Sequence, residues 1–242
     1  MTALRAARAG KPSKKMIVVD DHPMSREGIV AWILSVPGWE VSCQAETAEQ
    51  ALDAVIRTKP DIVVTDITLS GKSGLELIRD IHAIAPAVRI LVVSMHDERL
   101  FAERALRAGA HGYVTKQAKG QAIVEAIRRI LSGKFYVSQS MSQQILATLS
   151  NKKSGDGTSG VTQLTDREFE VFQLAGQGLS SAQISHRLHL SIKTVQAHRA
   201  KIKAKLQIKT APELISYAAN WLAHEDTISE RSSLGVSPKP PR

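Results

Sequence analysis

Hydrophobic residues in the first part of the chain gather in short runs, and longer amphipathic segments separate these runs. The runs are MIVV at 16–19, WEVSCQ at 39–44, DIVVTD at 61–66, RILVVS at 89–94 and HGYVT at 111–115. Short apolar runs that alternate with segments of helical period are typical of parallel strands connected by helices. Residues 16–137 therefore predict an α/β domain built on a five-stranded parallel sheet.

A different pattern begins after residue 161, where residues that can cap a helix precede each apolar segment. Capping boxes are possible at Thr165 with Glu168, at Ser180 with Gln183 and at Thr210 with Glu213, and Ser191 can cap a further helix alone. Only His189 and Leu190 separate the second of these helices from the third, which is the tight connection of a helix-turn-helix. Residues 162–223 therefore predict a small all-α domain of four helices.

Three segments carry neither pattern. Residues 1–15 hold basic side chains and no acid, and we expect a disordered basic arm there. Residues 138–161 overlap the Ser-, Gly- and Lys-rich stretch SNKKSGDGTSGVT, and we expect a linker there. Residues 224–242 contain SPKPP, and we expect a disordered tail.

The composition limits the class of protein. The chain has 242 residues, 43% of them hydrophobic, and no apolar stretch approaches the roughly 18 residues of a membrane span. The first residues lack the apolar segment of a signal peptide, so we expect a cytoplasmic protein without a membrane partner. Cys43 is the only cysteine, which excludes an internal disulfide and a cysteine cluster for zinc.

Positive charge is distributed unevenly along the chain, whose formal net charge is +9. The segment 16–137 is nearly neutral, whereas basic residues exceed acidic ones in the N-terminal arm and within 163–224. A basic C-terminal domain beside a neutral one indicates nucleic acid as a partner.

Three carboxylates are predicted to meet at one edge of the sheet. Asp20 and Asp21 follow one apolar run and Asp66 ends another, and parallel strands place their carboxyl ends at the same edge. Adjacent carboxylates need a cation, and all-oxygen ligation suits Mg²⁺. A carboxylate beside Mg²⁺ can attack a phosphoryl group, with Lys116 as a further positive partner. For any single one of these acids, a solvated loop residue is the alternative.

Four segments together resemble the receiver domain of response regulators: DDHP at 20–23, VVTD at 63–66, VVS at 92–94 and GYVTK at 112–116. The resemblance covers residues 16–137 and implies a flavodoxin-like fold. It implies that Asp66 is the phosphoacceptor, and that Asp20, Asp21 and Asp66 hold Mg²⁺ together with the backbone carbonyl of Thr68.

The same resemblance implies roles for three residues near the ends of later strands. Ser94 would bond the phosphoryl group, Lys116 would pair with it, and Tyr113 would reorient when Ser94 moves. Ser70 stands where many receivers have proline. His22 and His96 flank the predicted pocket, and we expect both to face solvent rather than to bind metal.

The segment 191–206 is basic and predicts an exposed helical face. Val195, Ile202 and Leu206 form one apolar stripe at helical spacing, and small residues bordered by basic and polar ones lie opposite. Such a face can enter a major groove, where Gln196 would reach base edges and lysines would meet phosphates. A lysine-rich helix that is merely solvated is the alternative.

LTDREFEV at 164–171, Gly178 and LSIKTVQAHRAKIKAKL at 190–206 look like the LuxR-type helix-turn-helix of the NarL/FixJ class of response regulators. Ser181 and Ser185 depart from residues common in that family. The resemblance implies dimer contacts through the last helix, for which Trp221 is our candidate because a large aromatic near a chain end needs a partner to cover it. The DNA-contacting residues that we expect are Lys193, Thr194, Gln196, Ala197, His198, Ala200 and Lys201.

These patterns favour a transcription factor that is switched by phosphorylation. Its expected partners are a sensor histidine kinase, double-stranded promoter DNA, RNA polymerase and, when it is phosphorylated, a second copy of the chain. The alternative is a phosphate sink or a protein-interaction regulator that does not read DNA sequence. An enzyme is disfavoured, because residues 162–222 contain no nucleophile with a base and no phosphate-binding glycine loop.

Overall fold

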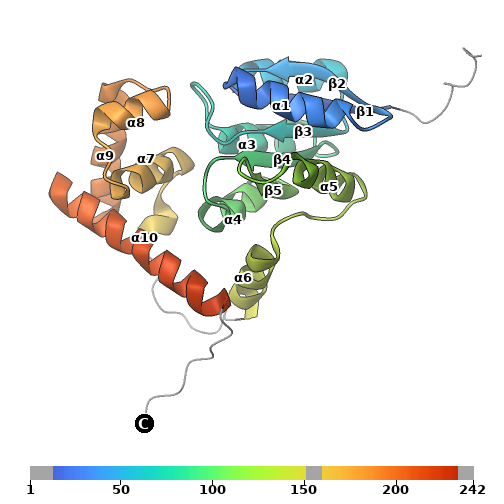
Figure 1. Cartoon of the computed structure of the whole chain (residues 1–242). Coiled ribbons are helices and arrows are strands. Elements are labelled where there is room, and N and C mark those ends of the chain that lie inside the picture. Colours follow the sequence, from blue (N-terminus) through green and yellow to red (C-terminus); the bar gives the residue numbers. More distant parts are fainter. Residues whose placement is uncertain (1–12, 151–159, 234–242) are drawn as a thin grey trace, which may run out of the picture. The chain divides into compact units, whose positions relative to one another are not determined.

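The computed structural model describes residues 13–150 and 160–233. The chain divides into two compact units, Met1–Val137 and Ser138–Arg242, and each unit is described by itself (Figure 1). No helix among the described residues is long and apolar enough to cross a lipid bilayer.

The first unit alternates strands with helices along its whole length. Its elements are β1 Lys14–Val19, α1 Pro23–Leu34, β2 Trp39–Ala45, α2 Ala48–Thr58, β3 Ile62–Thr65, α3 Gly74–Ile84, β4 Arg89–Ser94, α4 Glu98–Ala108, β5 Gly112–Thr115 and α5 Gly120–Leu131. The strands form one parallel sheet in the order β2-β1-β3-β4-β5. The predicted five-stranded parallel sheet is confirmed.

Helices cover both faces of this sheet, which is why β1, β3 and β4 are apolar along most of their length. Alternate residues of these strands, such as Met16 and Val18, pack against Ile29 of α1 and Ile127 of α5. The helices α2, α3 and α4 pack beside one another. The core therefore has two halves, one on each side of the sheet.

The register brings the ends of the central strands together. Val19 pairs with Thr65, so the two residues that follow, Asp20 and Asp66, leave the sheet side by side. Ser94 at the end of β4 pairs with Thr115 at the end of β5, so Lys116 follows directly. The parallel orientation thus places acidic, hydroxyl and basic groups at one edge.

The second unit is helical. It contains α6 Gln139–Ser150, a short 3₁₀ helix at Gly160–Gln163, α7 Asp166–Gly176, α8 Ser181–Arg187, α9 Ile192–Leu206 and α10 Ala211–Ser233. The capping boxes expected at Thr165 and Ser180 are formed, the backbone N–H of Thr194 donates to Ser191 Oγ, and Thr210 and Glu213 bond reciprocally. The predicted four-helix domain is confirmed, because each local cap begins a helix where the sequence places it.

Three element limits differ from the expectations. β1 begins at Lys14, inside the segment expected to be an arm, because Lys14 pairs in the sheet with Trp39 and its ammonium group contacts Asp61. α6 lies within the expected linker, where Ser138 Oγ accepts a hydrogen bond from the N–H of Met141. α10 continues through Ser233, into the expected tail. The rest of the expected arm, linker and tail (1–12, 151–159 and 234–242) lies outside the described residues.

Candidate functional site

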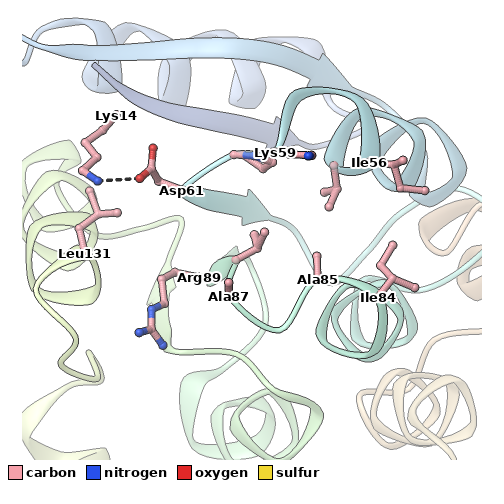
Figure 2. A pocket seen from close by; sticks show the side chains of 12 residues that line it. Lys14, Ile56, Lys59, Asp61, Ile84, Ala85, Ala87, Arg89 and Leu131 are labelled. Carbon is pink, nitrogen blue, oxygen red and sulfur yellow. Dashed lines mark hydrogen bonds and ion pairs between the residues drawn. The ribbon is translucent and has the colours of Figure 1, made fainter. Parts of the chain in front are cut away.

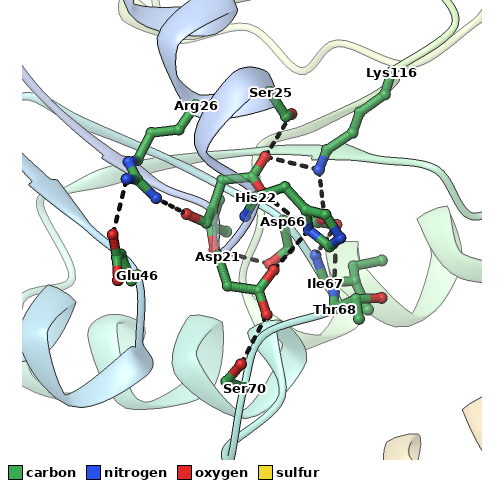
Figure 3. Close-up of polar contacts among 12 residues, drawn as sticks. Asp21, His22, Ser25, Arg26, Glu46, Asp66, Ile67, Thr68, Ser70 and Lys116 are labelled. Carbon is green, nitrogen blue, oxygen red and sulfur yellow. Dashed lines mark hydrogen bonds and ion pairs between the residues drawn. The ribbon is translucent and has the colours of Figure 1, made fainter. Parts of the chain in front are cut away.

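A lysine joins two buried carboxylates at the carboxyl edge of the sheet. Lys116 Nζ lies 2.7 Å from Asp20 Oδ2 and 2.6 Å from Asp66 Oδ2 (Figure 3). The side chains of Asp20 and Asp66 are 0% and 4% exposed. Three sequence-predicted residues from the ends of three different strands therefore converge.

The second oxygen of Asp66 is held by its own loop. Its Oδ1 accepts hydrogen bonds from the N–H groups of Ile67 at 2.6 Å and Thr68 at 3.3 Å. Burial raises the pKa of Asp66 above its ordinary value, although the charge of Lys116 and the hydroxyl of Ser94 oppose that effect. The carboxylate thus depends on nearby positive charge to stay ionised.

The charge of Lys116 is itself stabilised by the acids. Burial lowers its pKa, but Asp66 and Asp20 outweigh burial, and the pKa of Lys116 lies above its ordinary value. The lysine is therefore cationic at neutral pH.

Two residues that the sequence analysis did not single out fix Asp20. Ser25 Oγ donates to Asp20 Oδ2 at 2.6 Å, and Arg26 Nη1 donates to the Asp20 carbonyl oxygen at 2.6 Å. Arg26 is in turn paired with Glu46 at 2.9 Å. Both residues lie in the first turn of α1, which begins at Pro23, so the spacing from Asp20 to the helix start was the signal available in the sequence.

The side chain of Asp21 has different partners from that of Asp20. Its Oδ2 accepts from Ser70 Oγ at 3.0 Å, and its Oδ1 lies 2.7 Å from His22 Nδ1. Ser70, where many receivers have proline, thus links the β3–α3 loop to the acidic pair.

The donor atoms fit a hard cation. Asp20, His22 and Asp66 each offer one ligand atom, and these atoms lie within 4.8 Å of one another. Two of the three are carboxylate oxygens, the ligand type that Mg²⁺ prefers. Asp21 is not in this group, and the carbonyl of Thr68 stays a prediction as a metal ligand. Two of the three acids expected to cluster, Asp20 and Asp66, are in this group.

Ser94 and Tyr113 lie beside the carboxylates and are almost fully buried. The Tyr113 hydroxyl donates to the backbone carbonyl of His96 at 2.9 Å, and the N–H of His96 lies 3.4 Å from Ser94 Oγ. Burial raises the pKa of Tyr113 well above its ordinary value, so its hydroxyl keeps its proton. The ring of Tyr113 is therefore directed inward, with its hydroxyl bonded to the loop after β4.

The expectation that His96 faces solvent is wrong. His96 is only 9% exposed, its Nε2 lies 2.9 Å from Thr68 Oγ1, and its ring packs 4.3 Å from that of Phe101. It connects the loops after β3 and β4. The residue type and its position in a loop do not reveal this contact. His22 has a 57% exposed side chain, as expected, but it contacts Asp21.

The outward face of α9 is as the hydrophobic pattern predicts. Val195 and Ile202 are fully buried. Of the residues expected to contact DNA, Lys193, Gln196, Ala197, Ala200 and Lys201 are exposed, whereas Thr194 and His198 are half-buried. Arg199 instead bridges helices, because its Nη1 donates to Ser181 Oγ of α8 at 2.9 Å. Ser181, one departure from the family pattern, therefore has a structural partner.

Trp221 packs against aromatic rings of its own unit and stays partly exposed. Its ring lies 5.7 Å from that of Phe169 and 5.8 Å from that of Phe172, both on α7. Part of the cover that this ring needs therefore comes from α7. A dimer contact at Trp221 stays a prediction.

Both halves of the chain match known families. Residues 16–128 match the response regulator receiver domain, and residues 162–218 match the luxR family of bacterial regulatory proteins. The two matches cover most of the first unit, and α7, α8, α9 and the first part of α10 in the second.

Regulatory proteins of known name are similar to most of this chain. Transcriptional activator protein ExaE of Pseudomonas putida is 36% identical over 204 residues, covering 84% of this chain and 94% of that protein. Oxygen regulatory protein NreC of Staphylococcus haemolyticus is 31% identical over 208 residues, covering 84% and 96%. The crystal structure of a LuxR-family two-component response regulator from Aurantimonas sp. SI85-9A1 is 40% identical, with a TM-score of 0.53, covering 57% of this chain and 99% of that one.

Proposed function

Since the chain belongs to the DNA-binding response regulators that join a receiver domain to a LuxR-type helix-turn-helix, we propose that phosphorylation of Asp66 controls its binding to promoter DNA. The phosphoryl donor is a phosphohistidine of a sensor kinase. The protein acts in the cytoplasm, where DNA and RNA polymerase are found. One observation carries the proposal: a lysine, only 11% exposed, that contacts two buried carboxylates, Asp20 and Asp66.

The chemistry follows from this arrangement. A carboxylate oxygen of Asp66 attacks the phosphorus atom, a new P–O bond forms, and the P–N bond to the donor imidazole breaks. Lys116 pairs with the transferred phosphoryl group and offsets its charge. Asp20 and Asp66, with Asp21 and the Thr68 carbonyl, would hold Mg²⁺, which when bound would neutralise charge on the phosphoryl oxygens. Ser25 and Arg26 keep Asp20 in position for that role.

Phosphorylation is coupled to shape through Ser94 and Tyr113. The Ser94 hydroxyl bonds a phosphoryl oxygen, and the surrounding loop moves with it. That loop includes His96, whose carbonyl accepts the Tyr113 hydrogen bond, so Tyr113 reorients as well. The altered surface favours a homodimer, which presents two helix-turn-helix domains to DNA.

The second unit reads DNA through α9. Lys193 and Lys201 border its exposed face and neutralise phosphates, while Gln196 and Ala197 near the helix start contact base edges. The other proposed DNA contacts of α9 come from Thr194, His198 and Ala200. Arg199 holds α8 against α9 and so acts through helix placement rather than through phosphate contact.

A salt-dependent DNA titration of the full chain tests this assignment. Gln196→Ala should weaken binding by roughly 1–3 kcal/mol at one base pair per half-site, because a glutamine side chain can form two hydrogen bonds with adenine. Lys201→Ala should weaken binding to all sequences and reduce the salt slope by about one. Lys134→Ala, which removes an exposed lysine from the other unit, is the charge-matched control and should change neither quantity.

The same titration separates the proposal from its alternative. Binding by the parent chain that is indifferent to DNA sequence would favour a phosphate sink or protein-interaction regulator. A normal sequence preference after Gln196→Ala would mean that a different face of α9 enters the groove.

A further inference from the structure

The edge of the sheet opposite Asp66 holds a hollow of about 660 Å³. It lies where the central strands begin, between the first residues of β1 and β4 and the C-terminal ends of α2, α3 and α5 (Figure 2). Its volume is within the range of small-molecule sites, roughly 300–1,000 Å³. Nothing in the proposed phosphorylation chemistry uses this hollow.

Positive charge lines this hollow. Lys14, Lys59 and Arg89 line it, together with one carboxylate, that of Asp61. Asp61 is already engaged, because it accepts hydrogen bonds from Lys14 Nζ at 2.6 Å and from the N–H of Lys15 at 2.9 Å. Burial raises the pKa of Asp61, but these bonds outweigh it and keep the group ionised. The charges of Lys14 and Asp61 therefore offset each other.

The other two cations have no such compensation. The Arg89 guanidinium lies 2.9 Å from His111 Nε2, a group that brings no negative charge. Within the described ranges, neither Arg89 nor Lys59 forms an ion pair with a carboxylate. The hollow thus carries a net positive charge that a ligand of opposite sign would neutralise.

Lys59 occupies an uncommon backbone conformation in the middle of the lining. It ends α2 with φ of 47°, in the left-handed region where glycine or asparagine is usual. Ile56 of α2, close to Lys59, and Ile84 at the end of α3 expose 66% and 52% of their surface (Figure 2). A cation and exposed apolar side chains therefore line the same hollow.

We propose that this hollow binds a small amphipathic organic anion, whose anionic group pairs with Lys59 and whose hydrocarbon part covers Ile56 and Ile84. Charge complementarity selects the occupant, because a small anion balances the cations that have no carboxylate partner and the exposed isoleucines favour a hydrocarbon body. The N-terminal arm of the chain fits poorly, since its charged residues Arg5, Arg8 and Lys11 have the same sign as the hollow.

Titration of the ¹⁵N-labelled full chain with octanoate tests the proposal by amide chemical shifts. Octanoate should give saturable shifts at Lys59, Asp61 and Ala87, with a Kd of about 1 mM or below. Octylammonium, with the same chain and the opposite charge, and octanol, with none, should bind at least about fivefold more weakly. These comparisons use the parent chain and need no variant.

Two variants locate the anion. Lys59→Gln should weaken octanoate binding about fivefold, because it removes the proposed counter-charge. Arg57→Gln removes a cation of the same helix that pairs with Asp53 and does not line the hollow, so affinity should stay within about twofold. Circular dichroism of both variants checks the fold.

Three results would overturn the proposal: no saturable shift up to about 10 mM octanoate, equal binding of octanoate and octylammonium, or shifts confined to residues away from the hollow. Equal affinities of the parent and a folded Lys59→Gln variant would also overturn it. None of these results depends on Asp66, so they leave the proposed phosphorylation switch unaffected.

Discussion

At the scale of single residues, the site depends on how Asp20 is held. A buried carboxylate is stabilised by each donor that it accepts from, and Asp20 receives the Ser25 hydroxyl, the N–H of His22 and the Lys116 ammonium group. The hydroxyl is the only one of these three that a side-chain truncation removes without removing charge or backbone.

Ser25→Ala should therefore slow phosphate incorporation from a small phosphodonor by about five- to tenfold, the kinetic equivalent of roughly 1–1.5 kcal/mol. The half-saturating Mg²⁺ concentration should rise as well, because the carboxylate loses its fixed orientation. Phosphate incorporation as a function of Mg²⁺ concentration measures both effects. Ser35→Ala removes an exposed hydroxyl that caps the other end of α1 through the Trp32 carbonyl, and it should leave both unchanged. Equal rates for the two variants would contradict this role of Ser25.

At this scale, the sequence predicts a residue's position well where the backbone fold sets it. It predicts the position poorly where side-chain packing sets it. Asp20, Asp66 and Lys116 could be brought together in advance because parallel strands end at one edge. The burial of His96 could not, because it depends on Phe101 and Thr68, which reach it from other segments. The contact of Asp21 with Ser70 and the rings that pack against Trp221 could not be predicted either, because these partners too come from other segments of the chain.

At the scale of elements, α3 approaches the phosphoacceptor loop so closely that its first residue must lack a side chain. A Cβ at Gly74 would lie 2.0 Å from the carbonyl oxygen of Asp66 and 2.7 Å from Cα of Ile67, both backbone atoms that cannot rotate away. The N–H of Gly74 also donates to the Ile67 carbonyl at 2.7 Å.

Gly74→Ala should destabilise the chain by about 2 kcal/mol and displace the loop that carries Asp66. Gly28→Ala is the matched control, because Gly28 lies in α1 and a Cβ added there would meet no atom within 4 Å. It should stabilise the chain by roughly 0.5–1 kcal/mol through helix propensity. Urea unfolding of the full chain measures both changes, and a stabilising Gly74→Ala would refute the close approach.

An ion pair between α7 and α9 orients the proposed recognition helix. Lys205 Nζ lies 2.6 Å from Glu168 Oε2, which also belongs to the α7 capping box. Burial raises the pKa of Glu168, but Lys205 and the N–H of Thr165 outweigh it and hold the pKa below its ordinary value of 4.5. Because the folded-state pKa is the lower one, the stabilisation is present above pH 4.5 and is lost as pH falls through the folded value.

Lys205→Met should therefore lower stability at pH 7 by roughly 0.5–1 kcal/mol, a modest value because the lysine is partly solvated and screened. The difference from the parent should shrink as the pH falls below 4.5. Calorimetric unfolding of the full chain at a series of pH values measures this. Lys203→Met, on the same helix, should show no such dependence, and a constant difference for Lys205→Met at all pH values would argue against the pair.

The helices of the second unit were predictable from their caps, but the ends of elements without a clear stop were not. Thr165, Ser180 and Ser191 each start a helix where the sequence indicates one. α6 begins just after Ser138, within the expected linker, and α10 extends past Ala223 without a glycine or proline to end it. In such segments, helix propensity alone predicts the ends of helices poorly.

At the scale of the whole molecule, the receiver sheet separates two chemistries. Its carboxyl edge carries buried acids and Lys116, which suit phosphoryl transfer, and its opposite edge carries the cationic hollow. The division into an α/β unit and a helical unit was predictable, because the hydrophobic period changes between them.

The central claim is that a phosphoryl group on Asp66 changes DNA affinity, and one binding experiment tests it directly. DNA selected with the parent chain is titrated with parent, Asp66→Asn and Ser94→Ala proteins, each with and without a small phosphodonor and Mg²⁺. The phosphodonor should tighten binding by the parent about tenfold, within the usual range of coupling. Asp66→Asn should not respond, and Ser94→Ala should take up phosphate without the full gain in affinity. An equal response of the Asp66→Asn protein and the parent would contradict the account.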